Sequence, residues 1–159
     1  MSTGDRYCID TSALIHAWVR AYPEWNFPSF WSNVDDLIDA NRLTSSVEVL
    51  EELRKKNDEL VEWANGRDPM FRDLDDAIQE RVTEILGTYP RLVDTRKNRS
   101  MADPFVVALA SLYDPMLIVI TEEGASGKID KPRMPDVCNA EGIDCISLVE
   151  LITREGWRM

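Results

Sequence analysis

Histidine and cysteine are scarce in this chain of 159 residues, which contains one histidine and three cysteines. The cysteines are widely spaced and form no Cys-x-x-Cys pair, so neither a zinc knuckle nor a disulfide framework is indicated for Cys8, Cys138 and Cys145. We expect them to be reduced and mostly buried thiols, as in a cytoplasmic protein.

Long apolar runs are also absent. No segment approaches the roughly 18 apolar residues of a membrane-spanning helix, and the first residues lack the apolar core of a signal peptide. Basic residues are few, with 18 Lys and Arg against 29 Asp and Glu and a formal net charge of -11. Such a charge counts against unaided, high-affinity binding of nucleic acids. The sequence therefore predicts a soluble, cytoplasmic protein without membrane contact.

Short apolar runs alternate with amphipathic segments along the chain, and its length predicts a single domain over residues 1–159. Strands are expected at residues 7–9, 42–44, 116–120 and 144–147. Helices are expected at residues 11–20, 31–40, 46–65, 70–86, 102–112, 137–141 and 148–155, with loops at 21–30 and 124–135. This alternation predicts an α/β fold whose mostly parallel sheet is covered on both faces.

Acidic side chains stand where the expected strands end. Asp10 directly follows the first strand, Glu122 and Glu123 follow the strand at 116–120, and Asp103 opens a helix. Ligand sites of open parallel sheets lie at the carboxyl ends of the strands. We therefore expect these carboxylates to lie close together.

A further pair of carboxylates, Glu48 and Glu52, shares one face of the expected helix at 46–65. Carboxylates that converge repel one another unless a cation neutralises them. Mg²⁺ or Mn²⁺ suits such oxygen ligands. Either ion can polarise a phosphodiester and lower the pKa of an attacking water. This chemistry needs no histidine, which suits a chain whose one histidine is His16.

Each of these residues also has an ordinary structural interpretation. Asp10 and Asp103 can be helix N-caps, because Asp is a favoured capping residue. Glu48 and Glu52 can belong to a solvated helix face, and the Glu122–Glu123 pair to an exposed loop. Their joint placement, more than any single residue, favours a metal site.

Four segments resemble, in the order expected, the acidic motifs of PIN domains. They are YCIDTSALI at residues 7–15, SVEVLEEL at 46–53, ADPFVVALA at 102–110 and IVITEE at 118–123. The resemblance implies an α/β/α sandwich that holds Mg²⁺ or Mn²⁺ through Asp10, Glu52, Asp103 and Glu123. Its register favours Glu123 over Glu122 and leaves Glu48 as a helper. PIN domains often carry Asp where this chain has Glu123. Because glutamate is longer, its contact with the metal is either mediated by water or absent.

The same resemblance implies a metal-dependent endoribonuclease that acts as the toxin of a toxin–antitoxin pair, with RNA as substrate and a small antitoxin as partner. A homodimer is also compatible with it. The hydroxyls of Thr11 and Ser12 either orient Asp10 or a bound water, or simply cap the helix.

Two side-chain groups outside the acidic motifs have an open role. Basic residues flank the expected site in sequence and either steer a phosphate backbone or form solvated loops: Arg91, Arg96, Lys97, Arg99, Lys128, Lys131 and Arg133. Six aromatic residues are concentrated between residues 18 and 31: Trp18, Tyr22, Trp25, Phe27, Phe30 and Trp31. They either pack against one another or form a surface that an antitoxin helix covers.

Three other functions compete with the ribonuclease. A phosphatase with an aspartyl nucleophile places Asp after the first strand but needs a second Asp at position 12, where this chain has Ser12. A metal-dependent adhesion domain needs serine at position 14, where Leu14 stands. A catalytically degenerate PIN fold that only binds a partner is the third alternative, and the net charge and Glu123 keep it open.

Overall fold

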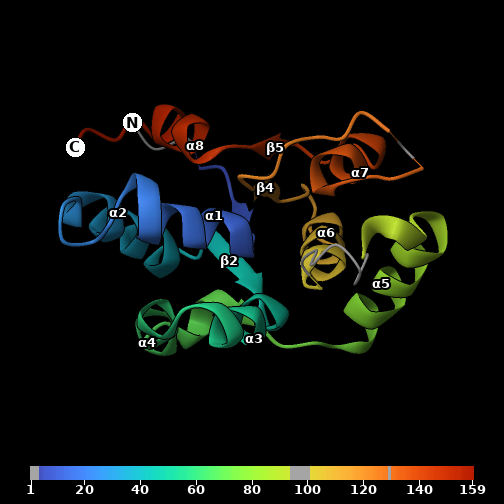
Figure 1. Ribbon diagram of the computed structural model, residues 1–159, viewed down its shortest axis with the longest axis horizontal. Helices are drawn as coiled ribbons and strands as arrows, with labels where there is room; N and C mark the ends of the chain where they lie inside the picture. The colour runs from blue at the N-terminus through green and yellow to red at the C-terminus, as the bar shows by residue number, and fades with distance from the viewer. Residues whose placement is uncertain (1–3, 94–100, 129) are drawn as a thin grey trace.

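The computed structural model describes residues 4–93, 101–128 and 130–159 and has a five-stranded parallel sheet at its centre (Figure 1). The strand order is β3-β2-β1-β4-β5. The strands are β1 (Tyr7–Ile9), β2 (Leu43–Ser46), β3 (Phe71–Arg72), β4 (Ile118–Ile120) and β5 (Cys145–Ile146). The predicted α/β fold with a three-layer architecture is confirmed.

Helices cover both faces of this sheet. In chain order they are α1 (Thr11–His16), α2 (Pro28–Asp39), α3 (Val47–Lys56), α4 (Asp58–Asn65), α5 (Asp76–Thr88), α6 (Asp103–Ser111), α7 (Met134–Ala140) and α8 (Leu148–Glu155). A π-helical turn, η1 (Ala17–Ala21), extends α1, and two 3₁₀ turns, η2 (Asp68–Met70) and η3 (Pro90–Leu92), precede β3 and follow α5. Figure 1 shows α1 and α2 on one side of the sheet and α5, α6 and α7 on the other. Across the described ranges, none of these helices combines the length and apolarity that crossing a bilayer requires.

Helix α6 is the central element of its layer. It packs against β1, β2 and β4 on one side and against α5 and α7 on others. Seven of its nine residues are buried, which explains why its sequence is apolar around most of its circumference. Because α6 begins beside the carboxyl ends of β1 and β4, its first residue, Asp103, lies at that edge of the sheet.

Several predicted helices have different bounds in the structure, among them α7, which begins at Met134 and not at residue 137. The helix expected at 46–65 is interrupted at Asn57, whose backbone is extended and whose side chain accepts a hydrogen bond from the Leu60 amide at 3.0 Å. The helix expected at 70–86 begins only at Asp76, because Phe71–Arg72 pairs with β2 and Asp75 caps α5. Helix α2 begins within the expected 21–30 loop, at Pro28, which occupies the first turn.

The last helix is attached to the opening of the sheet by a buried polar contact. The Tyr7 hydroxyl donates to Glu155 Oε2 at 2.5 Å, and Arg42 Nη2 donates to the same oxygen at 2.6 Å. This contact joins α8 to β1 and to the residue before β2, so the two ends of the described chain are held to one side of the fold.

Candidate metal centre

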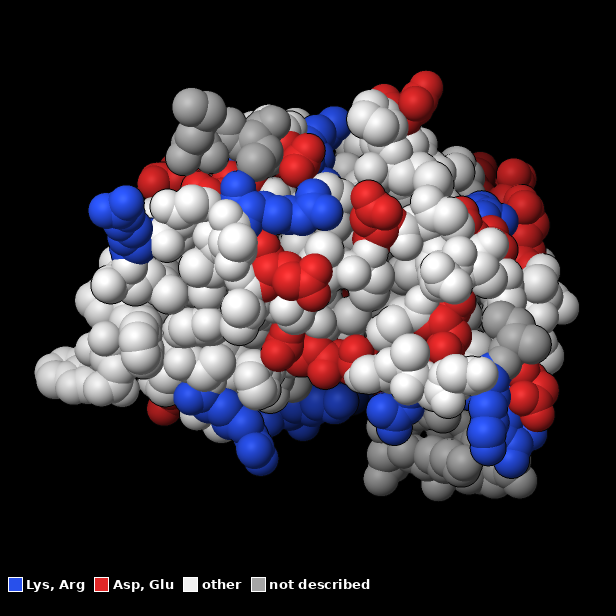
Figure 2. Space-filling view, turned by 90° about the horizontal axis from the view of Figure 1, so that it is seen from above, with Lys and Arg blue, Asp and Glu red and all other residues white. Residues whose placement is uncertain are grey.

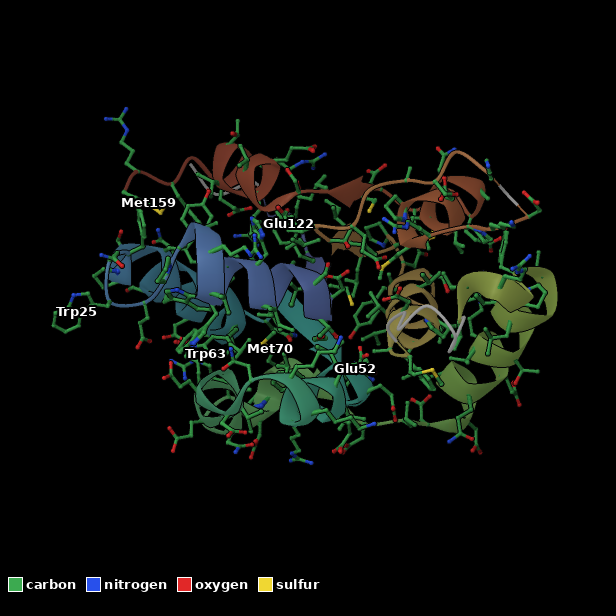
Figure 3. All side chains as sticks on the ribbon, in the orientation of Figure 1. Trp25, Glu52, Trp63, Met70, Glu122 and Met159 are labelled. Atoms are coloured by element: carbon green, nitrogen blue, oxygen red, sulfur yellow. The ribbon has the colours of Figure 1, made fainter. Side chains whose placement is uncertain are left out.

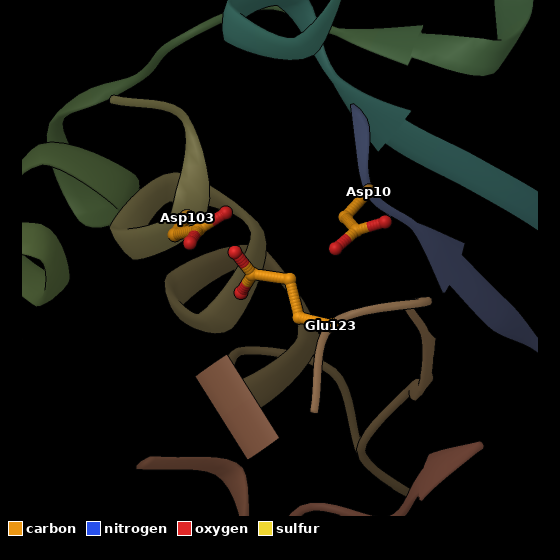
Figure 4. A group of neighbouring side chains, drawn as sticks. All are labelled: Asp10, Asp103 and Glu123. Carbon is orange, nitrogen blue, oxygen red and sulfur yellow. The ribbon is translucent and has the colours of Figure 1, made fainter. Parts of the chain in front are cut away.

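Three carboxylates from separate segments meet at the carboxyl edge of the sheet. Asp10 follows β1, Glu123 follows β4, and these neighbouring strands are in register at Ile9 and Ile120. Asp103 joins them from the N-terminus of α6. One carboxylate oxygen from each of the three residues lies within 4.8 Å of the others. Figure 4 shows the three side chains directed toward a common space; we call this group the acidic triad.

Asp10 is both a helix cap and a member of the acidic triad. It is 1% exposed. Its Oδ1 accepts from the Ala13 amide at 2.8 Å, which caps α1. The Ser12 hydroxyl lies 2.9 and 3.0 Å from the two carboxylate oxygens, and the Thr121 hydroxyl donates to Oδ2. The capping and the metal-site interpretations of Asp10 are therefore compatible.

Burial raises the pKa of the Asp10 carboxyl from 3.8 to about 7. The hydrogen bonds from Thr121, Ala13 and Ser12 lower this pKa, and the negative charge of Glu123 raises it. The ionised form is thus disfavoured in the folded protein by lost hydration and by a nearby like charge. A bound cation would act against both effects.

Glu123 supplies an unsatisfied acceptor to the same group. Its Oε2 is buried and has no hydrogen-bond partner among the residues that the structure describes. Its backbone amide donates to Thr121 Oγ1 at 3.1 Å, which holds the loop after β4 in place. A buried carboxylate oxygen without a donor is destabilising, so this atom indicates a ligand that the described residues do not provide. The length of glutamate does not keep it from the acidic triad.

Glu122 points to a different part of the fold. Its Oε2 accepts from the Leu148 amide at 2.9 Å, at the start of α8. Its Oε1 lies 3.5 Å from His16 Nε2. Of the two adjacent glutamates, Glu123 is therefore the one that joins Asp10 and Asp103, as the register favoured.

Glu52, expected to hold the metal directly or through water, lies outside the acidic triad. Its Oε1 accepts from the Thr11 hydroxyl at 2.8 Å, and its Oε2 accepts from the Met101 amide at 3.2 Å. Thr11 is adjacent to Asp10, and Met101 lies two residues before Asp103. The buried Glu52 carboxylate, in the middle of α3 and labelled in Figure 3, thus connects the two segments that carry the aspartates. Glu48, the expected helper, is not in the triad either.

Thr121 is the contact that sequence reasoning missed. Its hydroxyl donates to Asp10, accepts from the Glu123 amide and lies 3.2 Å from the Ser12 hydroxyl. The signal was present, because a threonine that directly follows a buried strand and precedes an acidic pair sits at the edge where ligands bind.

The basic residues do not cover the middle of the face over α7 and α8. Figure 2 shows Lys and Arg gathered along one edge of this view and separated by acidic and uncharged side chains across its middle. Lys128, Lys131 and Arg133 are exposed. Three of the other expected phosphate contacts, Arg96, Lys97 and Arg99, lie outside the described residues.

Comparison with known proteins adds a family but no activity. A search of curated proteins gave no match. A family model described as a domain of unknown function, DUF4411, matches residues 7–159, a span that contains all three members of the acidic triad. Since the match covers nearly the whole chain, the protein belongs to the DUF4411 family.

Proposed function

We propose that the protein is an endoribonuclease that depends on Mg²⁺ or Mn²⁺ and holds the ion through Asp10, Asp103 and Glu123. The observation that carries the proposal is the convergence of these carboxylates within 4.8 Å. Carboxylate oxygens are the ligands that both ions prefer, and two carboxylates with several waters are a common set for Mg²⁺. The raised pKa of Asp10 and the Glu123 Oε2 without a partner among the described residues are features expected of carboxylates that share a cation.

The chain's own groups orient the proposed ligands. Hydroxyls of Ser12 and Thr121 fix the rotation of the Asp10 carboxylate. Glu52 accepts hydrogen bonds from Thr11, which follows Asp10, and from Met101, which precedes α6. These two bonds hold the segments that carry Asp10 and Asp103 at a fixed distance from each other. When bound, the ion supplies a water of lowered pKa and polarises the phosphodiester. Preorganised ligands of this kind do not have to reorganise when substrate arrives.

The choice of RNA as substrate comes from the resemblance of the four acidic segments to PIN domains. The same resemblance supports a cytoplasmic toxin that a small antitoxin inhibits, with a homodimer as a compatible assembly. The net charge of -11 predicts weak binding of RNA alone and strong dependence on the metal and on salt.

RNA cleavage with matched variants tests the proposal. Purified protein should cut a labelled single-stranded RNA with Mn²⁺ and not with EDTA. We expect Asp103→Asn and Glu123→Gln to lower the rate by about 100-fold or more, because a metal contributes several kcal/mol to transition-state stabilisation. Glu122→Gln is the control, since it changes the adjacent residue outside the acidic triad and keeps an oxygen for the Leu148 amide.

Two alternatives have distinct outcomes in the same experiment. Hydrolysis of p-nitrophenyl phosphate without cleavage of RNA would indicate a metal-dependent phosphatase. Binding of Mn²⁺ without turnover of either substrate would indicate a binding module of the same fold, which the acidic surface favours. Equal RNA cleavage by wild type and Asp103→Asn would contradict the proposed centre.

A further inference from the structure

Aromatic side chains pack together at the end of the molecule formed by η1, α2 and α4. Trp18, Trp31 and Trp63 contact one another with ring centroids 5.0 to 6.4 Å apart. Tyr22 stacks on Phe30 at 4.6 Å, and Phe30 also contacts Trp31. Self-packing, one of the two expectations for this group, is therefore observed, although much of it comes from helices.

Trp25 is the exception among the expected aromatic group. It is 92% exposed, and Figure 3 shows it projecting from the edge of the molecule, far from the labelled Glu52. A fully exposed indole gains nothing from burial in the folded monomer. Its position beside the packed cluster makes it available to an external partner.

Two hollows open beside these aromatic rings. The first, of about 510 Å³, is lined by Glu24, Trp25, Pro28, Trp31, Ser32 and Asp35. The second, of about 480 Å³, is lined by Trp18, Glu24, Glu59, Glu62 and Trp63. Because both include Glu24, they adjoin and form one surface, which we call the indole–carboxylate face.

The charge of this face is negative and only partly compensated by Arg67, which pairs with Asp35 and interacts electrostatically with Glu24. Glu24, Glu59 and Glu62 are exposed, and none of them makes a hydrogen bond or salt bridge to another described residue. Asp35 is the paired carboxylate, since both of its oxygens accept from Arg67. Indole faces and carboxylates both attract cations, so the face disfavours RNA and favours a basic group.

The protein already holds one guanidinium by this chemistry. The Arg67 guanidinium lies 4.5 Å from the centroid of the Trp63 ring. It donates to the two oxygens of Asp35 at 2.5 and 2.9 Å. Trp18, Trp25 and Trp31 have no such cation over their rings among the described residues. One guanidinium is therefore already bound at the edge of the indole–carboxylate face, between Trp63 and Asp35. Trp25, Glu59 and Glu62 offer the same kinds of group to a second cation.

A buried donor on the same face favours a peptide over a free cation. Trp63 is 5% exposed, and its Nε1 has no acceptor in the part of the chain that the structure describes. Trp63 forms part of the wall of the second hollow. A main-chain carbonyl of a peptide can accept a hydrogen bond from such a donor, whereas a lone cation cannot.

We propose that the indole–carboxylate face binds an arginine-bearing segment of a basic protein partner. Arginine is favoured over lysine because its planar guanidinium stacks on indole rings and pairs with carboxylates through two parallel hydrogen bonds. The net charge of -11 accelerates the approach of such a segment at low ionic strength. This inference is independent of the acidic triad and of the proposed nuclease activity.

Peptide titration tests the inference with the full-length protein. The probe is a ten-residue peptide with three arginines, compared with peptides of the same sequence that carry lysine or the neutral isostere citrulline. Binding is measured by calorimetry at low salt. We expect binding of the arginine peptide, weaker binding of the lysine peptide and none of the citrulline peptide. Trp25→Ala should weaken binding about tenfold, as expected for loss of a cation–π contact; because Trp25 is exposed, the variant should fold normally.

A matched charge control separates a specific face from general attraction. The triple variant Glu24→Gln, Glu59→Gln, Glu62→Gln removes three charges from the face. The triple variant Asp73→Asn, Glu80→Gln, Asp144→Asn removes three exposed charges elsewhere. We expect at least a tenfold loss of affinity in the first and less than a twofold loss in the second. Equal losses, equal binding of the citrulline peptide, or no binding of the arginine peptide would overturn the inference.

Discussion

Asp10 accepts hydrogen bonds that cap α1 while its carboxylate faces Glu123 across the acidic triad. For single residues, the sequence correctly predicted that Asp10 and Glu123 lie close together, because the carboxyl ends of neighbouring parallel strands meet at the same edge of the sheet. It was less informative for Glu52. Helical spacing gives the face on which Glu52 lies, but not that Thr11 and Met101 occupy its two oxygens. Such contacts depend on the distance between segments, which a local pattern does not contain.

The raised pKa of Asp10 predicts a pH-dependent difference between wild type and Asp10→Asn without divalent ions. The folded state keeps the proton up to about pH 7, whereas the unfolded chain releases it near 3.8. Asp10 therefore destabilises the fold increasingly as pH rises through this interval. At about 1.4 kcal/mol per pH unit, the variant should gain about 4 kcal/mol relative to wild type between these limits.

Urea denaturation in EDTA at pH 4 to 8 measures this difference. Glu141→Gln is the control, because its effect on stability should change with pH in the opposite direction. The hydrogen bond from the Tyr89 hydroxyl lowers the pKa of Glu141, so the stabilisation by the Glu141 carboxylate is lost as pH falls. Its stability relative to wild type should decrease with rising pH. A pH-independent difference for Asp10→Asn would show that the Asp10 carboxyl titrates normally.

Glu52 is predicted to position the ligands and not to bind the metal. Glu52→Ala leaves two donors unsatisfied, so we expect a loss of about 2 kcal/mol in the free energy of unfolding. Glu52→Gln keeps an acceptor for Thr11 and should weaken Mn²⁺ binding by about 10- to 100-fold, as for a group that orients a ligand without touching the metal. If Glu52→Gln removed Mn²⁺ binding as completely as Asp103→Asn, Glu52 would be a direct ligand.

At the scale of elements, the sequence predicted the buried strands better than the boundaries of the helices. The run at β4 is apolar and its burial is complete, so its pattern was unambiguous. The two-residue strand β3 has no periodicity of its own and exists because Ser45 and Ser46 pair with it. The helix break at Asn57 was likewise hidden, because α3 and α4 together have a nearly continuous helical pattern.

Asn57→Ala tests the helix break at Asn57, because the sign of its effect on the free energy of unfolding depends on whether the helix is interrupted there. In the structure Asn57 caps α4, so loss of its side chain should destabilise the protein by about 1 kcal/mol. In an uninterrupted helix the same substitution would stabilise, because alanine has the higher helix propensity. Asn65→Ala, at the exposed last position of α4, is the comparison and should have a smaller effect. Chemical denaturation of the three proteins distinguishes these outcomes.

At the scale of the whole molecule, the α/β fold brings the three carboxylates together, while the net negative charge of the chain makes their approach unfavourable. Binding of a divalent ion should therefore stabilise the fold. At a concentration 100 times the dissociation constant, the gain is about 2.7 kcal/mol, which for a domain of this size corresponds to a rise in Tm of about 5 to 10 °C. Differential scanning calorimetry with Mn²⁺ should show this rise for wild type and not for Asp103→Asn.

The most direct test of the acidic triad is anomalous diffraction from crystals soaked in Mn²⁺. We expect a strong manganese peak in direct contact with carboxylate oxygens of Asp10, Asp103 and Glu123, and no such peak in crystals of Asp103→Asn. A wild-type crystal with millimolar Mn²⁺ and no peak between these three residues would contradict the metal centre.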